Sequence, residues 1–312
     1  MRAAAVCLAL TLAIAAREAR AHGDVHRRIE ALDRLLATEG GDAARLMERG
    51  TLYASDQDWP AAVRDLEGAR DLDPTLPGLD ERLANALLQV GEAERAALEL
   101  EAVLARDPTS ADARLVRARA LADLGRFDEA DAEFGRAIEL AAKPSPRMYL
   151  DRAGALLEAT PARTDAALAA LESGVERLGA LVVFVERAQE IELARGRAAE
   201  ALAWTDRLPD DVRAAPDWRL RRAKIHDAAG NRSAARRELE AALSALEALP
   251  PNRRRTEALE ALRTEILVLQ ASLQDAELAR SPTSWWWAAA GGATALVAAL
   301  LLRSRARPSR AR

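Results

Sequence analysis

The sequence contains little of what most catalytic and metal sites are built from. Its 312 residues include a single cysteine, Cys7, and three histidines, His22, His26 and His226. It has no Gly-rich phosphate loop and no His-Glu-x-x-His pairing, so the motifs of nucleotide hydrolases and zinc proteases are missing. We therefore predict that the protein is not an enzyme and uses no cofactor.

Aromatic residues and lysine are also scarce. Aromatic side chains make up 4% of the chain, whereas hydrophobic residues, many of them alanine, make up 50%. Lysine occurs only at Lys143 and Lys224, so arginine carries nearly all the positive charge. The net charge is −4 even with the arginines of residues 303–312 included, so the body of the chain is acidic and unsuited to nucleic acid phosphates. The composition favours closely packed helices and excludes a nucleic-acid partner.

A pattern of 34 residues recurs three times over residues 43–144, in copies that begin at Ala43, Pro77 and Ala111. Its eighth and twentieth positions hold small residues: Gly50, Ala84, Ala118, Ala62, Ala96 and Ala130. Its eleventh and twenty-fourth positions hold large apolar residues: Tyr53, Leu87, Leu121, Leu66, Leu100 and Phe134. This agreement in phase predicts one structural unit that repeats along the chain.

The spacing of small and large residues predicts two antiparallel helices in each copy. Small side chains let the first helix (A) and the second helix (B) approach, and large side chains fill the space beside that contact. Gly91 and Gly125 mark the turn between A and B, where glycine readily adopts a left-handed conformation. In the third copy we expect Ala130 in the contact between the helices and Glu133 exposed to solvent. Because one pair cannot bury its apolar faces alone, neighbouring pairs should stack.

This helix–turn–helix pattern resembles the tetratricopeptide repeat family. The resemblance implies an all-α fold, a right-handed α-solenoid of about six helix pairs. The repeats are expected near residues 43–76, 77–110, 111–144, 146–181, 182–215 and 216–249. The fifth copy fits least well, since Glu192 and Thr205 take positions that are apolar in the first three copies.

The resemblance also implies a binding surface. In this family the A helices line a concave groove that holds an extended peptide or a helix of a partner protein. The residues that correspond to groove positions are Met47, Thr51, Asn85, Gln89, Arg119, Arg147, Glu186, Glu190 and Lys224. We predict a peptide or partner-binding groove at these residues.

The repeats are flanked by two further helical segments. Residues 22–42 are expected to form an N-terminal capping helix and residues 250–280 a C-terminal one. In the second segment, one apolar face carries Leu259, Leu262, Ile266, Leu269 and Leu273. That face could cover the end of the stack or form a dimer through a short coiled coil, and the two uses compete for it.

Both ends of the chain carry targeting signals. Residues 1–21 have a basic start, an apolar stretch and a small-residue ending at Ala21, as in a cleaved signal peptide. Residues 285–302 form an uncharged run that opens on three tryptophans and would span about 27 Å as a helix, near the thickness of a bilayer core. The basic tail, residues 303–312, is expected to stay in the cytoplasm. We therefore predict a transmembrane helix at residues 285–302, an inner-membrane anchor and a body in the periplasm.

The sequence thus predicts a non-enzymatic interaction scaffold of the bacterial cell envelope, whose partners are one or more envelope proteins. Two alternatives stay open. The C-terminal tail resembles sorting signals that are removed by processing, which would place the protein on the cell surface. His22 and His26, at the terminus left by signal cleavage, would instead suit a periplasmic metal-handling protein. Beyond these two histidines, no metal site is expected.

Overall fold

The computed structural model of the protein describes residues 23–250 and 256–278, with side chains as far as residue 274. Within these residues every regular element is a helix. The chain divides into two units, one ending at Pro209 and one starting at Asp210. The expected signal peptide, His22, the expected transmembrane helix at residues 285–302 and the basic tail lie outside the described residues. None of the described helices is long and apolar enough to cross a membrane.

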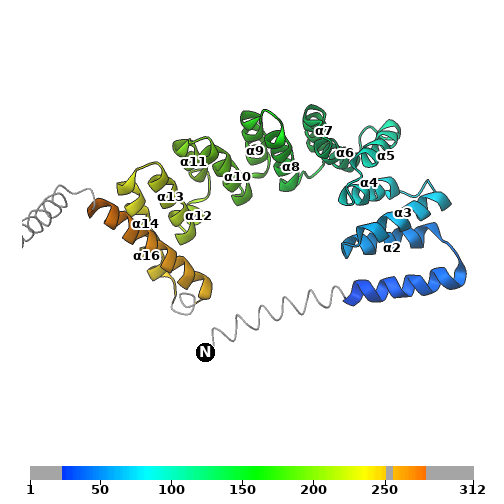
Figure 1. Ribbon diagram of the computed structural model, residues 1–312, viewed down its shortest axis with the longest axis horizontal. Coiled ribbons are helices and arrows are strands. Elements are labelled where there is room, and N and C mark those ends of the chain that lie inside the picture. The colour runs from blue at the N-terminus through cyan, green and yellow to red at the C-terminus, as the bar shows by residue number, and fades with distance from the viewer. Residues whose placement is uncertain (1–22, 251–255, 279–312) are drawn as a thin grey trace, which may run out of the picture. The chain divides into compact units, whose positions relative to one another are not determined.

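Unit 1 is a row of helix pairs, each with a first helix A and a second helix B (Figure 1). A helix over residues 23–39 precedes them. The A helices are α2 (Ala43–Ser55), α4 (Leu79–Gln89), α6 (Ala111–Asp123), α8 (Pro146–Glu158) and α10 (Val182–Ala194). The B helices are α3 (Trp59–Leu72), α5 (Ala93–Arg106), α7 (Phe127–Leu140), α9 (Thr164–Leu178) and α11 (Ala198–Thr205). The prediction of an all-helical fold made of stacked helix pairs is confirmed.

The small residues of the repeat lie where A and B approach each other. A Cβ atom added to Gly50 would be 3.0 Å from Leu66 Cγ and 3.2 Å from the Ala62 carbonyl oxygen, so no larger residue fits without a shift. Ala62 and Ala130 are fully buried. The prediction that Ala130 lies in the contact between helices is therefore confirmed.

The prediction that Glu133 is exposed is wrong. Its side chain is only 15% exposed and accepts hydrogen bonds from Arg114 Nη1 at 2.9 Å and Arg117 Nη1 at 2.8 Å. The reason lies in the repeat itself, because position twenty-three of helix B faces position seven of helix A. The same pair recurs as Arg49 with Asp65, where Nε lies 2.6 Å from Oδ2.

The fifth pair, α10 and α11, replaces an apolar contact with a polar one. Gln189 Nε2 donates to Thr205 Oγ1 at 2.5 Å and to the Ala201 carbonyl oxygen at 3.2 Å. Gln189, Glu192 and Thr205 are all buried. The departures of this copy from the repeat pattern are thus compensated partly by hydrogen bonds between its two helices.

The turn from A to B needs a left-handed residue in most pairs. Gly91, Gly125 and Gly196 take φ values between 72° and 81° at this turn. The first pair has Gln57 there, with φ at 65°. A residue with a Cβ atom is strained in this region, by about 1–2 kcal/mol.

Replacing Gln57 with glycine should therefore raise the free energy of unfolding by about 0.5–1 kcal/mol, since relief of strain exceeds the added freedom of the unfolded chain. Urea unfolding followed by circular dichroism measures the change. The matched control is Gly91→Ala, where no atom lies within 4 Å of the added Cβ and only backbone strain acts. That variant should lose about 1 kcal/mol. Destabilisation by Gln57→Gly would contradict the assignment of strain.

Unit 2 contains α12 (Asp210–Arg213), α13 (Pro216–Ala228), α14 (Arg232–Ala248) and α16 (Glu257–Leu278). Ile266 and Leu273 of α16 are buried in one apolar cluster with Leu239 and Leu246 of α14. The remaining apolar residues of that face, Leu259, Leu262 and Leu269, pack against the same cluster. This face of α16 is therefore used within the chain, and it cannot also form a dimer while it packs on α14.

Candidate functional site

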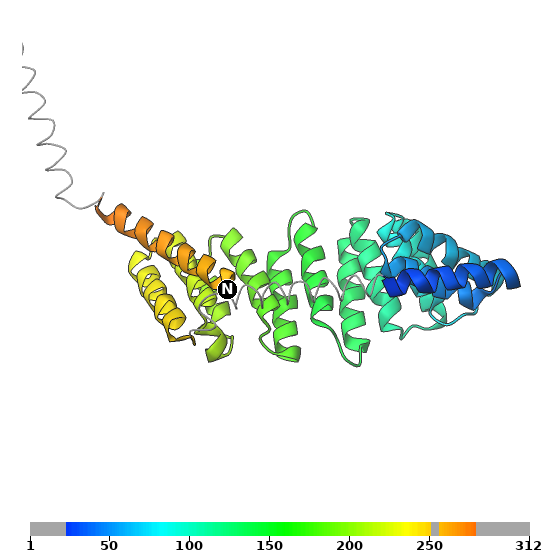
Figure 2. The same cartoon turned by 90° about the horizontal axis from the view of Figure 1, so that it is seen from below.

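The A helices of unit 1 contact one another in sequence. α2 contacts α4, α4 contacts α6, α6 contacts α8 and α8 contacts α10. The first B helices, α3 and α5, are instead joined by long side chains, through Arg70 with Glu99 and Arg95 with Glu67. The green helices of Figure 2, which belong to the middle of unit 1, lie side by side in a row. A continuous face of A helices results, here called the A-helix face.

The predicted groove residues all lie on A helices or on α13. Unit 1 holds Met47 and Thr51 on α2, Asn85 and Gln89 on α4, Arg119 on α6, Arg147 on α8, and Glu186 and Glu190 on α10. Lys224 lies on α13 of unit 2, where its Nζ atom is 2.6 Å from Glu265 Oε1 of α16. The binding role of these nine residues stays a prediction.

Two of these residues are brought together by an acid that the sequence reading did not single out. Arg119 donates from Nη2 to Asp151 Oδ2 at 2.7 Å and from Nε to the same oxygen at 2.9 Å. Arg147, one turn before Asp151, pairs with Oδ1 of the same carboxylate. The Asp151 side chain is only 13% exposed, so α6 and α8 are tied by a partly buried cluster of charges. The i, i+4 spacing of Arg147 and Asp151 was the available signal.

The other predicted residues differ in whether their polar atoms already form hydrogen bonds within the protein. Met47 packs against the apolar core, and Thr51 Oγ1 donates to the Met47 carbonyl oxygen at 2.7 Å. Glu190 accepts a hydrogen bond from Arg187 Nη1 at 2.9 Å. The amides of Asn85 and Gln89, one turn apart on α4, have no side-chain hydrogen bond within the described part of the chain. These two amides are therefore the least engaged polar groups among the nine predicted residues.

The predicted metal residues are only partly described, since His22 lies outside the structure's described range. His26 Nε2 lies 3.6 Å from Asp56 Oδ2 of the α2–α3 turn. Among the described residues no three His, Cys, Asp or Glu side chains gather as metal ligands would. His226 of α13 is partly buried, and burial lowers the pKa of its imidazole.

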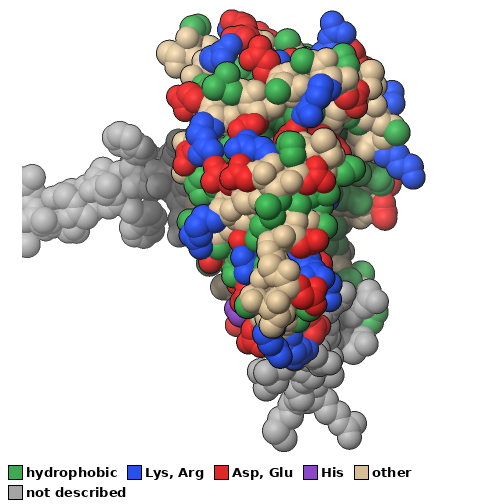
Figure 3. Space-filling view, turned by 90° about the vertical axis from the view of Figure 1, so that its right-hand side faces the viewer, with side chains coloured by type: hydrophobic (Ala, Val, Ile, Leu, Met, Phe, Trp, Pro, Cys, Tyr) green, Lys and Arg blue, Asp and Glu red, His purple; other side chains and the backbone are tan. Residues whose placement is uncertain are grey.

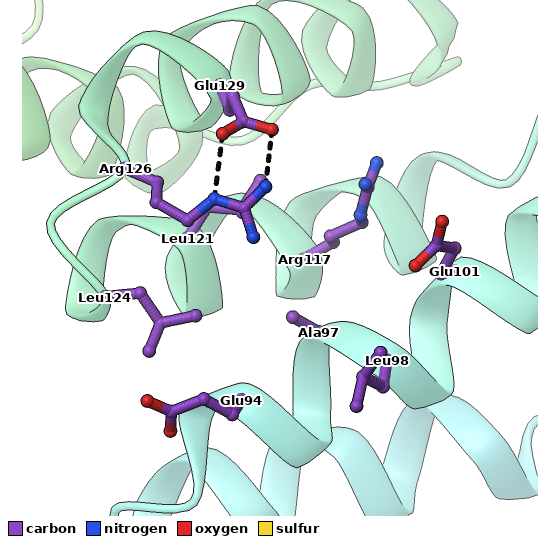
Figure 4. A pocket seen from close by; sticks show the side chains of 9 residues that line it. All are labelled: Glu94, Ala97, Leu98, Glu101, Arg117, Leu121, Leu124, Arg126 and Glu129. Carbon is purple, nitrogen blue, oxygen red and sulfur yellow. Dashed lines mark hydrogen bonds and ion pairs between the residues drawn. The ribbon is translucent and has the colours of Figure 1, made fainter.

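A pocket of about 460 Å³ opens between α5, α6 and α7 (Figure 4). Its apolar part consists of Ala97, Leu121, Leu124 and Leu98, the last of which is 66% exposed. None of the nine residues that line the pocket belongs to the predicted groove. The sequence reading missed this site because the exposed Leu98 falls outside the repeat's apolar positions.

Charged residues surround the apolar part of the pocket. Arg126 donates from Nε and Nη2 to the two carboxylate oxygens of Glu129, at 2.8 and 2.7 Å. These bonds, and to a smaller extent the charge of Glu101, raise the pKa of the Arg126 guanidinium. Arg117 is held by Glu133. Both cations of the pocket therefore have an acid partner, although Arg117 shares the Glu133 carboxylate with Arg114.

The face of the molecule drawn in Figure 3 mixes the two signs of charge. On the face drawn in Figure 3, basic and acidic side chains alternate with hydrophobic ones, and no broad field of one sign forms. Ion pairs between helices account for much of this, for example Arg106 with Asp80 and Arg152 with Asp131. This face therefore offers no extended field of one sign that would steer a charged partner from a distance.

Comparison with known proteins supports the architecture. A family model described as tetratricopeptide repeat matches residues 87–150. A tetratricopeptide repeat protein from Parabacteroides merdae has a TM-score of 0.50 and 18% identity, over 78% of this chain and 93% of that chain. The C-terminal part of a TPR repeat-containing protein from Cytophaga hutchinsonii has a TM-score of 0.55 and 15% identity, over 73% of this chain and 93% of that chain. At these identities the likeness shows the fold alone, and no curated protein matches the sequence significantly.

Proposed function

We propose that the chain is a non-enzymatic scaffold that binds another protein along its A-helix face. The basis is that residues 87–150 match a tetratricopeptide repeat model and that the fold is similar to that of tetratricopeptide repeat proteins. The ligand is an extended peptide or a helix of the partner, held in the groove of a right-handed solenoid. Stacked helix pairs suit this role because they present a long, rigid surface without requiring a catalytic centre.

The observation that carries the proposal is the free pair of amides on α4. Asn85 and Gln89 each offer a donor and an acceptor, which match the N–H and C=O groups of a peptide backbone. Asn85 is partly buried beside the apolar core, whereas Gln89 is exposed. A ligand bound there would satisfy both amides, and the Arg119–Asp151–Arg147 cluster would fix the neighbouring helices in place.

The test is to remove the two amides and measure partner binding. A photo-crosslinking residue at Thr51, exposed on α2, should capture a partner in living cells, to be identified by mass spectrometry. Asn85→Ala with Gln89→Ala should lower the yield of that adduct by about tenfold, which corresponds to about 1.4 kcal/mol of binding free energy. Helical content and melting should not change, because neither amide bonds to the rest of unit 1.

Two controls make this result specific. A crosslinker at Glu139, exposed on the B helix α7, should give no such adduct. Arg119→Glu is avoided as a test, since it would place a second carboxylate against Asp151 and disturb the fold. An adduct at Thr51 that survives removal of both amides would show that Asn85 and Gln89 do not hold the ligand. Failure to obtain any adduct at Thr51 would count against the A-helix face as the working surface.

We further propose that the scaffold acts in the bacterial cell envelope. The support comes from sequence, namely the leader at residues 1–21 and the apolar run at residues 285–302 followed by arginines. Such a chain would be anchored in the inner membrane with its repeats in the periplasm, and its partners would be envelope proteins.

A reporter enzyme that works only outside the cytoplasm tests this placement. Inserted at Thr160, in the exposed loop between α8 and α9, it should be active. Fused after Arg312 it should be inactive. The reverse pattern would overturn the proposed topology, and a mature form on the cell surface that ends before Trp285 would support the sorting alternative instead.

A further inference from the structure

We propose that the pocket between α5, α6 and α7 is a second docking site, which takes an amphipathic helix with two basic residues on either side of an aliphatic one. The pocket shares no residue with the nine predicted groove residues, although Arg117 and Leu121 of its lining belong to the A helix α6. A scaffold with both sites could hold two protein segments at once.

The apolar lining of the pocket favours a ligand with an aliphatic side chain. Ala97 and Leu121 of its lining are buried, whereas Leu98 of α5 is 66% exposed. Figure 4 shows Ala97 and Leu98 between the two acids of α5, Glu94 and Glu101. An apolar group placed here would bury Leu98 and gain about 0.8 kcal/mol for each CH₂ group removed from water.

The charges around the pocket favour a ligand with basic residues. Its two arginines already pair with acids, Arg126 with Glu129 and Arg117 with Glu133, which Arg117 shares with Arg114. Glu94 and Glu101, by contrast, have no ion pair or hydrogen bond within the part of the chain that the structure describes. The rim therefore carries two carboxylates without an ion-pair partner, although the charge of Glu101 also acts on Arg126. Such carboxylates complement a basic ligand and disfavour an acidic one.

The spacing of the two acids selects a helix. Glu94 and Glu101 lie seven residues apart on α5, which is two turns or about 10.5 Å along one face. A partner helix laid along α5 places basic residues at i and i+7 opposite these acids, with an aliphatic residue at i+3 or i+4 over Leu98. In an extended peptide, residues on one face recur about every 6.6 Å, so its basic groups would not match both acids.

The experiment uses the full chain in a nonionic detergent and a synthetic helical probe with Lys at i and i+7 and Leu at i+3 and i+4. Fluorescence anisotropy should detect binding that weakens as salt is added. Glu94→Lys with Glu101→Lys should weaken it at least about tenfold, or about 1.4 kcal/mol. A second probe, with Glu in place of both Lys residues, should regain binding to this variant and bind the unchanged protein poorly.

The controls separate this site from others. Glu139→Lys with Glu176→Lys reverses two exposed acids that do not line the pocket and should leave binding unchanged. Leu98→Asp should abolish binding, whereas Asn85→Ala with Gln89→Ala should not affect it, so the two proposed sites can fail independently. Absence of probe binding, or equal binding by the Glu94/Glu101 variant, would overturn the proposal. Binding seen only after deletion of residues 303–312 would also overturn it, in favour of the chain's own basic tail as occupant.

Discussion

Replacing Ala130 with tryptophan should lower the free energy of unfolding by at least about 3 kcal/mol. Ala130 is fully buried on α7 beside α6, in a cluster that contains Leu121 and Phe134. An indole ring cannot fit there without pushing the two helices apart, and overpacking of a close contact is among the larger single-residue effects. Urea unfolding followed by circular dichroism would show an earlier transition.

The matched control is a neighbour on the same helix. Ala132 is exposed, two residues after Ala130, so tryptophan at position 132 adds the same ring without entering the contact. Its effect should stay within about 0.5 kcal/mol. Equal losses from the two variants would mean that the helices do not pack in the register described.

Replacing Arg49 with methionine should cost about 3 kcal/mol. Arg49 donates from Nε and Nη2 to the two oxygens of Asp65, at 2.6 and 2.7 Å, and from Nη1 to Asp33 at 2.6 Å. Asp65 is only 8% exposed, so loss of its partner leaves a carboxylate that water reaches poorly. Removing one member of a buried ion pair is far more costly than the pair is stabilising, because the remaining charge is desolvated. The measurement is again the free energy of unfolding in urea.

An exposed arginine provides the comparison for Arg49. Arg28 Nε donates to Glu48 Oε1 at 2.7 Å, but the two side chains are 58% and 43% exposed. Solvent screens such a pair, so Arg28→Met should cost less than about 1 kcal/mol. A loss as large as that from Arg49→Met would show that removal of any arginine disturbs unit 1, and that burial of Asp65 is not the cause.

Periodicity made the architecture predictable. Gly50, Ala62 and Ala130 recur in phase because the two helices of each pair approach closely at the same positions, where only small side chains fit. A pattern repeated three times can be read without any coordinates. The same logic predicted left-handed turn residues at Gly91 and Gly125, and their φ values of 81° and 73° confirm it.

The wrong prediction for Glu133 concerns a charged position of the repeat. Arg49 with Asp65 and Arg117 with Glu133 share a separation of 16 residues and the same two repeat positions. That recurrence can be read from the sequence. Acids on amphipathic helices usually face solvent, however, and this general expectation gave the wrong exposure for Glu133. Asp151 is different, because its partner Arg119 lies on another pair and only the stacking of α6 on α8 joins them.

The candidate sites were harder to predict than the fold. Helical phase indicates which of the predicted groove positions face outward. It does not show that Arg119 and Arg147 both pair with the carboxylate of Asp151, nor that the amides of Asn85 and Gln89 form no side-chain hydrogen bond in the described residues. The pocket near Leu98 depends on the angle between neighbouring pairs, which no single copy of the repeat encodes.

The contacts between helices in unit 1 have a consequence for synthesis. Each main contact joins helices that are adjacent or next but one along the chain, as in α2 with α3 and α2 with α4. Such a fold has low contact order, so little chain entropy is lost before a contact forms, and folding is expected to be fast. Helices α2 to α5 can therefore associate as they leave the ribosome or a translocation channel, before α10 has emerged. Early burial of their apolar faces would limit aggregation of the growing chain.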